Sequence, residues 1–282
     1  MENIVPSRRA LLGAGLLTAS ALAAPALVSN AAAQDNQPPA AKKQTFVLIH
    51  GAWHNGDLLE GVAKVIRAAG HTVFTPTLAG NGPGDSKSAG LDDAIDSIVE
   101  FFKKNNISDA VLCSHSYGGI PATGAADRLP KGAVKRLVYQ SAFVPNNGES
   151  LEDMNPPAFN ELFKVIKQPD GGLALPFVIW REGLMNDADE ELAKSTFAKL
   201  NNHPYNTMHD KIKLKTNPVE MTIAKSYILC WDDWGQPASL GGWQRFTERL
   251  GLYRFVSMPG GHEVCFTNPS LLGAKIMVAG RD

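Results

Sequence analysis

The stretch AVLCSHSYGG at residues 110–119 decides the fold. A continuous apolar run of strand length comes first, and a pattern with helical spacing follows it at residues 120–129. Ser116 lies between the two, with a small residue two positions before it, Ser114, and another two positions after it, Gly118. This arrangement is typical of a serine on a sharp strand-to-helix turn that lifts its hydroxyl above a sheet. The alternative is a serine that only caps the helix.

The rest of the chain alternates in the same way between apolar runs of strand length and segments with helical spacing. The strand-like runs are residues 45–49, 71–74, 110–113, 134–139, 226–230 and 253–256. The helical segments are residues 59–69, 94–104, 120–129, 242–250 and 269–278. Continuous apolar strands between helices predict an α/β fold with a doubly wound, mostly parallel six-stranded sheet covered on both faces. Ligands of such sheets bind beyond the carboxyl ends of the strands.

Residues from about 147 to 220 break the alternation with scattered prolines, aromatic residues and short helix-like pieces. The segment is too long for a structureless loop in a compact domain. We therefore expect a helical cap, inserted over the sheet, within a single domain that spans residues 45–282.

The first 33 residues have the pattern of an export signal. Arg8 and Arg9 precede an apolar stretch that is rich in Ala, Gly and Leu and ends in Ala31-Ala32-Ala33. The arginine pair resembles a twin-arginine signal, and residues 34–44 form an expected flexible leader. The alternative is an N-terminal membrane helix, which Pro25 and the small-residue end disfavour. We expect an exported protein, periplasmic or secreted, with no stable membrane anchor after cleavage.

The overall charge says little about a macromolecular partner. The net charge is −1, so electrostatics favour neither a nucleic acid nor a membrane surface. A small-molecule substrate is the expected partner, and the protein is expected to be a monomer or a homodimer.

His262 is the candidate base for Ser116. A serine hydroxyl is a poor nucleophile without a base. Of the seven histidines, only His262 lies in a loop after the last strand, where Gly260 and Gly261 permit a sharp turn. The base needs an acid, and two candidates follow the strand at residues 226–230, Asp232 and Asp233. The order Ser, Asp, His fits an esterase-type triad, but spacing does not separate the two acids.

An attacked carbonyl also needs N–H donors for its oxyanion. The amide of Tyr117, directly after the serine, is one candidate. The other is the amide of Ala52, in the loop after the first strand. This chemistry requires no metal and no organic cofactor.

Several further segments resemble the plant methylesterase and hydroxynitrile lyase branch of the α/β-hydrolase superfamily, together with its bacterial esterase relatives. They are FVLIHGAWH at 46–54, AGHTV at 69–73, PTLAGNG at 76–82, AFVP at 142–145, and YILC at 227–230 followed by WQR at 243–245. The resemblance implies the α/β-hydrolase fold, a Ser116–His262–Asp233 triad and oxyanion amides from Ala52 and Tyr117. It places the acid on Asp233, not on Asp232.

Two departures from that branch bear on the reaction. Lyase members typically have a threonine after the first-strand histidine and a lysine after the catalytic histidine, where this chain has Gly51 and Glu263. A glutamate would repel cyanide, so the resemblance favours a serine esterase that cleaves a small or medium carboxylic ester. Lactonase, carbon–carbon hydrolase and hydroxynitrile-lyase chemistry stay open as alternatives, as does a ligand-binding role without catalysis. The expected pocket residues are Gly51, Trp53, Phe159 and Trp180.

Overall fold

The structure is a computed structural model that describes residues 42–282. The expected signal at residues 1–33 and the leader up to residue 41 lie outside the described residues. Within residues 42–282, no helix is both long and apolar enough to cross a bilayer.

One six-stranded sheet organises the described chain. Its strands are β1 (Thr45–Ile49), β2 (Thr72–Phe74), β3 (Ala110–His115), β4 (Val134–Gln140), β7 (Ala224–Cys230) and β8 (Arg254–Met258). They lie in the order β2-β1-β3-β4-β7-β8, and every neighbouring pair is parallel. The predicted α/β fold with a six-stranded parallel sheet is therefore confirmed.

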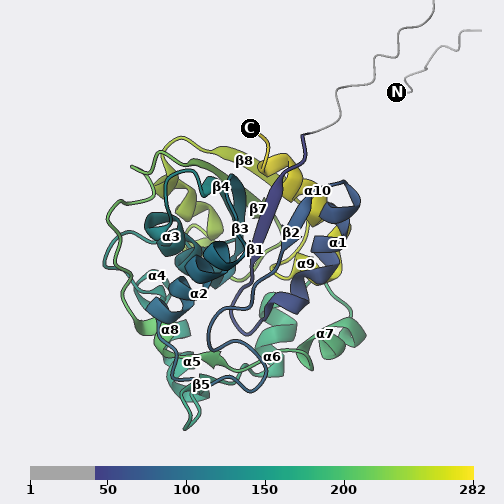
Figure 1. The fold of residues 1–282 in the computed structure, drawn as a ribbon. Coiled ribbons are helices and arrows are strands. Elements are labelled where there is room, and N and C mark those ends of the chain that lie inside the picture. The colour runs from purple at the N-terminus through teal and green to yellow at the C-terminus, as the bar shows by residue number, and fades with distance from the viewer. Residues whose placement is uncertain (1–41) are drawn as a thin grey trace, which may run out of the picture. The chain divides into compact units, whose positions relative to one another are not determined.

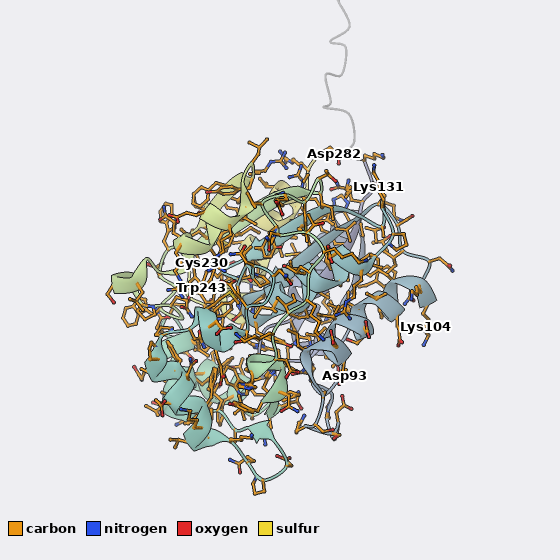
Figure 2. The ribbon with its side chains drawn as sticks, turned by 90° about the vertical axis from the view of Figure 1, so that its left-hand side faces the viewer. Asp93, Lys104, Lys131, Cys230, Trp243 and Asp282 are labelled. Atoms are coloured by element: carbon orange, nitrogen blue, oxygen red, sulfur yellow. The ribbon has the colours of Figure 1, made fainter. Side chains whose placement is uncertain are left out.

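Helices cover both faces of this sheet (Figure 1). On one face lie α1 (Glu60–Ala68) and α10 (Pro269–Ala279), which pack against each other. The other face carries α2 (Leu91–Lys104) and α3 (Gly119–Arg128). Figure 2 shows Asp93 and Lys104 near the two ends of α2, on the surface of its layer. Because each face has its own helical layer, both faces need apolar side chains.

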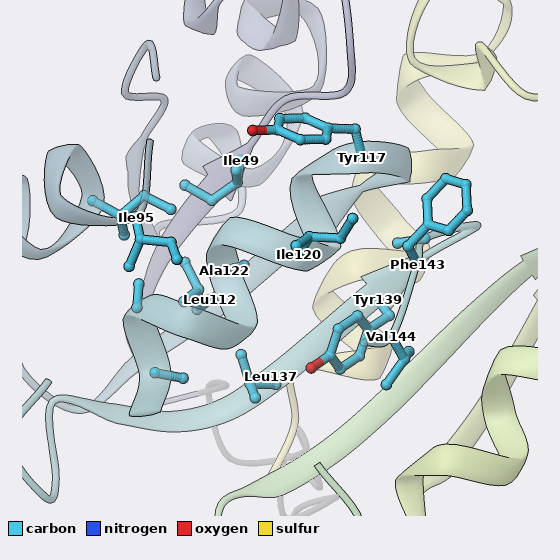
Figure 3. Close-up of a cluster of buried hydrophobic side chains, with 14 of the residues drawn as sticks. Ile49, Ile95, Leu112, Tyr117, Ile120, Ala122, Leu137, Tyr139, Phe143 and Val144 are labelled. Carbon is cyan, nitrogen blue, oxygen red and sulfur yellow. The ribbon is translucent and has the colours of Figure 1, made fainter. Parts of the chain in front are cut away.

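The apolar strand runs fill the two resulting cores. Every residue of β3 is buried, and alternate side chains enter opposite layers. In the layer under α3, Leu112, Leu137 and Tyr139 of the strands face Ile120 and its neighbours on the helix (Figure 3). The helix that follows Ser116 is therefore fixed by packing.

The chain between β4 and β7 forms short elements rather than sheet strands and long helices. They are α4 (Leu151–Met154), α5 (Pro157–Ile166), β5 (Gly172–Leu173), α6 (Phe177–Ile179), the π-helical η3 (Trp180–Leu184), α7 (Glu190–Phe197), β6 (His203–Pro204) and α8 (Asn206–His209). β5 and β6 pair as a small antiparallel ribbon. These elements lie beyond the end at which the sheet strands finish (Figure 1).

Shorter turns complete the loops at that end of the sheet. They are η1 (Gly56–Leu59), η2 (Ser116–Gly118), η4 (Ala238–Leu240), η5 (Trp243–Leu250) and α9 (Val264–Thr267). The helix expected at residues 242–250 is thus a 3₁₀ helix. It is bounded by Gly242 and Gly251, which both have positive φ and interrupt α-helical geometry.

Candidate active site

Ser116 occupies a strained turn between β3 and α3. Its φ is +53°, in the left-handed region that non-glycine residues rarely adopt. The turn is tight, because a Cβ added to Gly118 would lie 2.5 Å from the carbonyl oxygen of His50. Only a glycine fits there, which explains the small residue two positions after the serine.

His262 meets the Ser116 hydroxyl from the loop after β8. Its Nε2 lies 2.9 Å from Ser116 Oγ, and its Nδ1 lies 2.8 Å from Asp233 Oδ2. A carboxylate can only accept, so Nδ1–H donates to Asp233 and leaves Nε2 free to accept from the hydroxyl. The structure thus brings Ser116, His262 and Asp233 into one hydrogen-bonded chain.

The environment makes the His262 imidazole more basic. Burial alone lowers the pKa of His262, but the charge of Asp233 and its hydrogen bond outweigh burial and raise that pKa above the ordinary value. The neighbouring charge of Glu263 acts in the same direction. An imidazole of this kind is suited to accept a proton from a hydroxyl.

Asp232 has a different place in the same loop. Its carboxylate accepts from the backbone N–H of Gly260 at 3.1 Å, and its side chain is exposed. Asp233, in contrast, has no exposed side-chain surface beside His262. Asp232 therefore braces the loop, and Asp233 contacts the imidazole.

Two rings hold the plane of the His262 imidazole. The indole of Trp243 stacks on it with centroids 5.1 Å apart and planes 8° apart. On another side lies His115, with centroids 4.6 Å apart. Figure 2 shows Trp243 close to Cys230, the residue that ends β7.

The two expected oxyanion donors border the same space. Ala52 and Tyr117 both line the pocket together with Ser116. Tyr117 lies in the first turn of η2, where backbone N–H groups have no partner within the helix. Among the hydrogen bonds of residues 42–282, none uses the amide of Ala52. Both amides are thus available to an acceptor near the serine.

A largely apolar pocket opens above Ser116. Of the residues expected to line it, Trp53 and Phe159 do so. Gly51 does not, because it lies under the serine, where an added Cβ would be 2.8 Å from His115 Nδ1. Trp180 does not either. It is fully buried in the inserted segment, and its indole N–H donates to the carbonyl of Ala193.

Most of the wall was not foreseen from the sequence. Apolar side chains supply the larger part of it: Phe143, Leu151, Leu162, Phe163, Leu175, Ile179, Leu184, Met208 and Trp243. The amide side chains are Asn155 and Gln236, which are hydrogen-bonded to each other at 3.3 Å. No lysine or arginine is among the described residues that line the pocket. The pocket therefore suits a neutral, apolar group.

A contact between the inserted segment and the His262 loop was also missed. The Asp187 carboxylate accepts from the backbone N–H of Gly261 at 2.8 Å and from the hydroxyl of Thr267 at 2.9 Å. Nearby, the backbone N–H of Glu263 donates to the carbonyl of Leu184 at 3.3 Å. Nothing in the local sequence around Asp187 marks it as a partner of a loop so distant along the chain.

Comparison with known proteins identifies the family to which the chain belongs. Residues 46–272 match the model of a family described as the alpha/beta hydrolase family. The chain is 31% identical over 245 residues to a carbendazim hydrolyzing esterase from Nocardioides sp., covering 83% of this chain and 99% of that protein. It is 26% identical over 250 residues to salicylic acid-binding protein 2 from Nicotiana tabacum, covering 82% and 95%.

A solved structure gives the same result. An extracellular alpha/beta-hydrolase from a Paenibacillus species superposes with a TM-score of 0.81 at 29% identity, covering 85% of this chain and all of that one. That protein is described as sharing structural and functional homology with the tobacco salicylic acid binding protein. The turn at Ser116, the parallel sheet and these matches lead to one assignment: the chain belongs to the alpha/beta hydrolase family.

Proposed function

We propose that the protein is a carboxylic ester hydrolase in which Ser116 is the nucleophile, His262 the base and Asp233 the acid. The observation that carries the proposal is the continuous hydrogen-bonded chain from Ser116 Oγ through both nitrogens of His262 to Asp233. The relative named as a carbendazim hydrolyzing esterase supports the ester class.

The reaction proceeds through an acyl-enzyme. Ser116 Oγ attacks the ester carbonyl carbon as His262 Nε2 takes its proton, and Asp233 stabilises the imidazolium that forms. The tetrahedral intermediate then breaks its bond to the alcohol oxygen, which receives the proton from His262. Water, deprotonated by His262, then attacks the acyl carbon. The second tetrahedral intermediate breaks its bond to Ser116 Oγ, which takes the proton back from His262 as the carboxylic acid leaves.

The oxyanion of each tetrahedral intermediate is held by backbone amides. Ala52 and Tyr117 border the serine from two neighbouring loops, and each has a free N–H. Fixed amides require no rearrangement as charge develops on the oxygen, which is why such donors contribute strongly to rate.

The pocket indicates the kind of ester. Its apolar wall and its amide pair favour an uncharged, small or medium substrate with an apolar or aromatic group. A substrate carboxylate would find no cation in the wall and would lie near Glu263. The same negative charge disfavours cyanide, the leaving group of a hydroxynitrile lyase.

The test uses short-chain p-nitrophenyl esters, aromatic methyl esters and a fluorophosphonate probe on the purified full chain. We expect Ser116→Ala to abolish turnover and labelling, a loss on the order of 10⁴-fold or more. The matched control is Ser114→Ala, a second buried serine whose hydroxyl donates to the carbonyl of Val138. Turnover that survives in Ser116→Ala, or a folded wild type that turns over no ester, would refute the proposal.

A further inference from the structure

Behind the His262 imidazole lies a buried polar cluster that the proposed reaction does not use. It consists of His54 from the loop after β1, His115 at the end of β3 and Glu263 beside the base. Their exposed fractions are 2%, 4% and 2%. Three titratable side chains so deeply buried require a physical reason, because desolvation disfavours each charged form.

The cluster is connected to the base by short contacts. His54 Nε2 lies 3.2 Å from Glu263 Oε2. His115 Nε2 lies 3.1 Å from the carbonyl oxygen of His262, so its N–H donates to the backbone of the base. The rings of His54 and His115 are 6.0 Å apart, and those of His115 and His262 are 4.6 Å apart. His115 therefore packs against the imidazole, and His54 lies between His115 and the Glu263 carboxylate.

Glu263 carries the charge of this cluster. Burial opposes its ionisation, but the electrostatic interaction with His54, 3.2 Å away, outweighs burial and lowers the pKa of Glu263 to about 2. Burial lowers the pKa of His115 to about 3, so His115 is neutral at working pH. The residue next to His262 is therefore an ionised carboxylate at working pH, in addition to Asp233.

Packing alone does not account for an ionised glutamate here. The surroundings are aromatic, with Trp180 and Phe266 against the His54 ring, and an apolar residue would fill them. A buried ion pair is often no more stable than apolar side chains of similar volume. Neither ring nitrogen of His54 moreover has a hydrogen-bond partner among the described residues, so its contact with Glu263 is electrostatic. The glutamate is thus better explained by its effect on the neighbouring base.

We propose that Glu263, paired with His54, is a positioning residue that favours the imidazolium form of His262 during acyl transfer. The inference rests on the proposed function, because it concerns the base of that reaction. Asp233 holds Nδ1 directly, whereas Glu263, the next residue in the chain, acts through space. The two carboxylates together stabilise the positive charge that His262 acquires when Ser116 attacks.

Several loops and strands that pack around His262 contribute a charged or titratable side chain. These side chains are Asp233 after β7, Glu263 in its own loop, His115 from β3, His54 from the β1 loop and Asp187 from the inserted segment. Asp187 is exposed, so solvent screens its charge. Asp233 and Glu263 are the carboxylates whose charges raise the pKa of His262.

The experiment compares wild type with Glu263→Gln and with the double variant His54→Gln/Glu263→Gln. The single variant leaves His54 without its carboxylate partner and can misfold for that reason. The double variant replaces both buried residues, His54 and Glu263, by amides and so guards against this outcome. The readouts are the pH dependence of the fluorophosphonate labelling rate and of kcat/KM for a p-nitrophenyl ester.

The direction in which the pH profile should move follows from the protonation state of His262. Activity needs neutral His262 and falls as the pH drops through its raised pKa. Loss of the Glu263 charge lowers the pKa of His262, so the acid limb moves to lower pH, by about 0.5–1 unit. The plateau kcat falls a few-fold, because the imidazolium is less stabilised, while KM stays within about twofold. Glu263→Asp, which keeps the charge, restores much of the wild-type profile.

Asp57→Asn is the matched control, because Asp57 is an exposed carboxylate in the same loop as His54. We expect its acid limb to coincide with that of wild type. If the acid limb of both folded glutamine variants lies at the same pH as that of wild type, this inference is overturned, while the proposed function is unaffected. Absence of labelling in wild type would refute the proposed function and this inference with it.

Metal analysis of the purified wild type provides a second check. The donor atoms of His54, His115 and Glu263 lie within 4.8 Å of one another, a spacing from which a metal ion could also be held. One equivalent of metal in wild type, lost in the double variant, would overturn the inference by making these residues ligands. Metal-free protein with a shifted limb supports it.

Discussion

The loops at the ends of the sheet and the inserted segment between β4 and β7 border the same pocket but are built differently. Ser116, Asp233 and His262 follow β3, β7 and β8, strands joined by continuous parallel ladders. The insertion has strands of two residues each, and α6 has no buried residue. Backbone pairing over several strands restricts movement more than a few side-chain contacts do. The proposed reacting groups therefore belong to what we call the rigid half of the site, and much of the pocket wall to what we call the adaptable half.

The largest effect should come from the rigid half. We expect Asp233→Asn to lower kcat about 10³–10⁴-fold, because the amide cannot hold the required tautomer of His262 or stabilise its cation. Asp232→Asn, the matched control, should change kcat less than threefold. Measured kcat values and melting temperatures of both variants test this. Equal losses would mean that the loop acts as a unit, and that the distinction between Asp232 and Asp233 is unfounded.

An intermediate effect should come from the adaptable half. Phe159 of α5 lines the pocket, and Phe159→Ala should raise KM for aromatic esters about tenfold while leaving kcat for acetate esters within about twofold. Phe177→Ala is the control, since Phe177 packs on Phe197 and does not line the pocket. The test measures kcat and KM of both variants with aromatic esters and with acetate esters. A kcat loss on every ester would show that the wall also positions the reacting groups.

The smallest effect should arise where the two halves touch. Asp187→Ala removes the acceptor for Gly261 N–H and for the Thr267 hydroxyl, and should lower kcat about three- to tenfold. Asp187→Asn keeps an oxygen acceptor and should retain most activity. Melting temperature should fall by a few degrees in the alanine variant. If both variants keep wild-type activity, the contact contributes little, and the two halves of the site are independent.

The sequence predicts the rigid half well. Strands buried on both faces appear as continuous apolar runs. The serine turn has a local signature in the small residues Ser114 and Gly118, because the backbones of the strand and the helix leave little room beside the turn. Spacing left Asp232 and Asp233 open, since consecutive residues point in opposite directions and the direction depends on the loop. The resemblance favoured Asp233, and the structure places that carboxylate against His262.

Much of the pocket wall could not be predicted from the sequence, although the expected Trp53 and Phe159 do line it. Trp180 was expected in it but packs in the interior of the insertion, because aromatic residues in short helices serve packing and binding equally well. Gly51 was expected there and instead leaves room for His115 beneath the serine. The pairing of His54 with Glu263 depends on two loops meeting in space, which no local pattern records.

The strand order has a consequence for how the protein acquires activity. The serine, the acid and the base follow β3, β7 and β8, and β8 joins the sheet only through β7, which in turn joins through β4. Parallel pairings between distant segments form slowly, because the intervening chain must first be ordered. Partly refolded molecules can therefore show helical signal and buried tryptophan without activity. We expect serine labelling to recover after dilution from denaturant only once β3 and β8 both have their places in the sheet, so that labelling reports on the completed sheet.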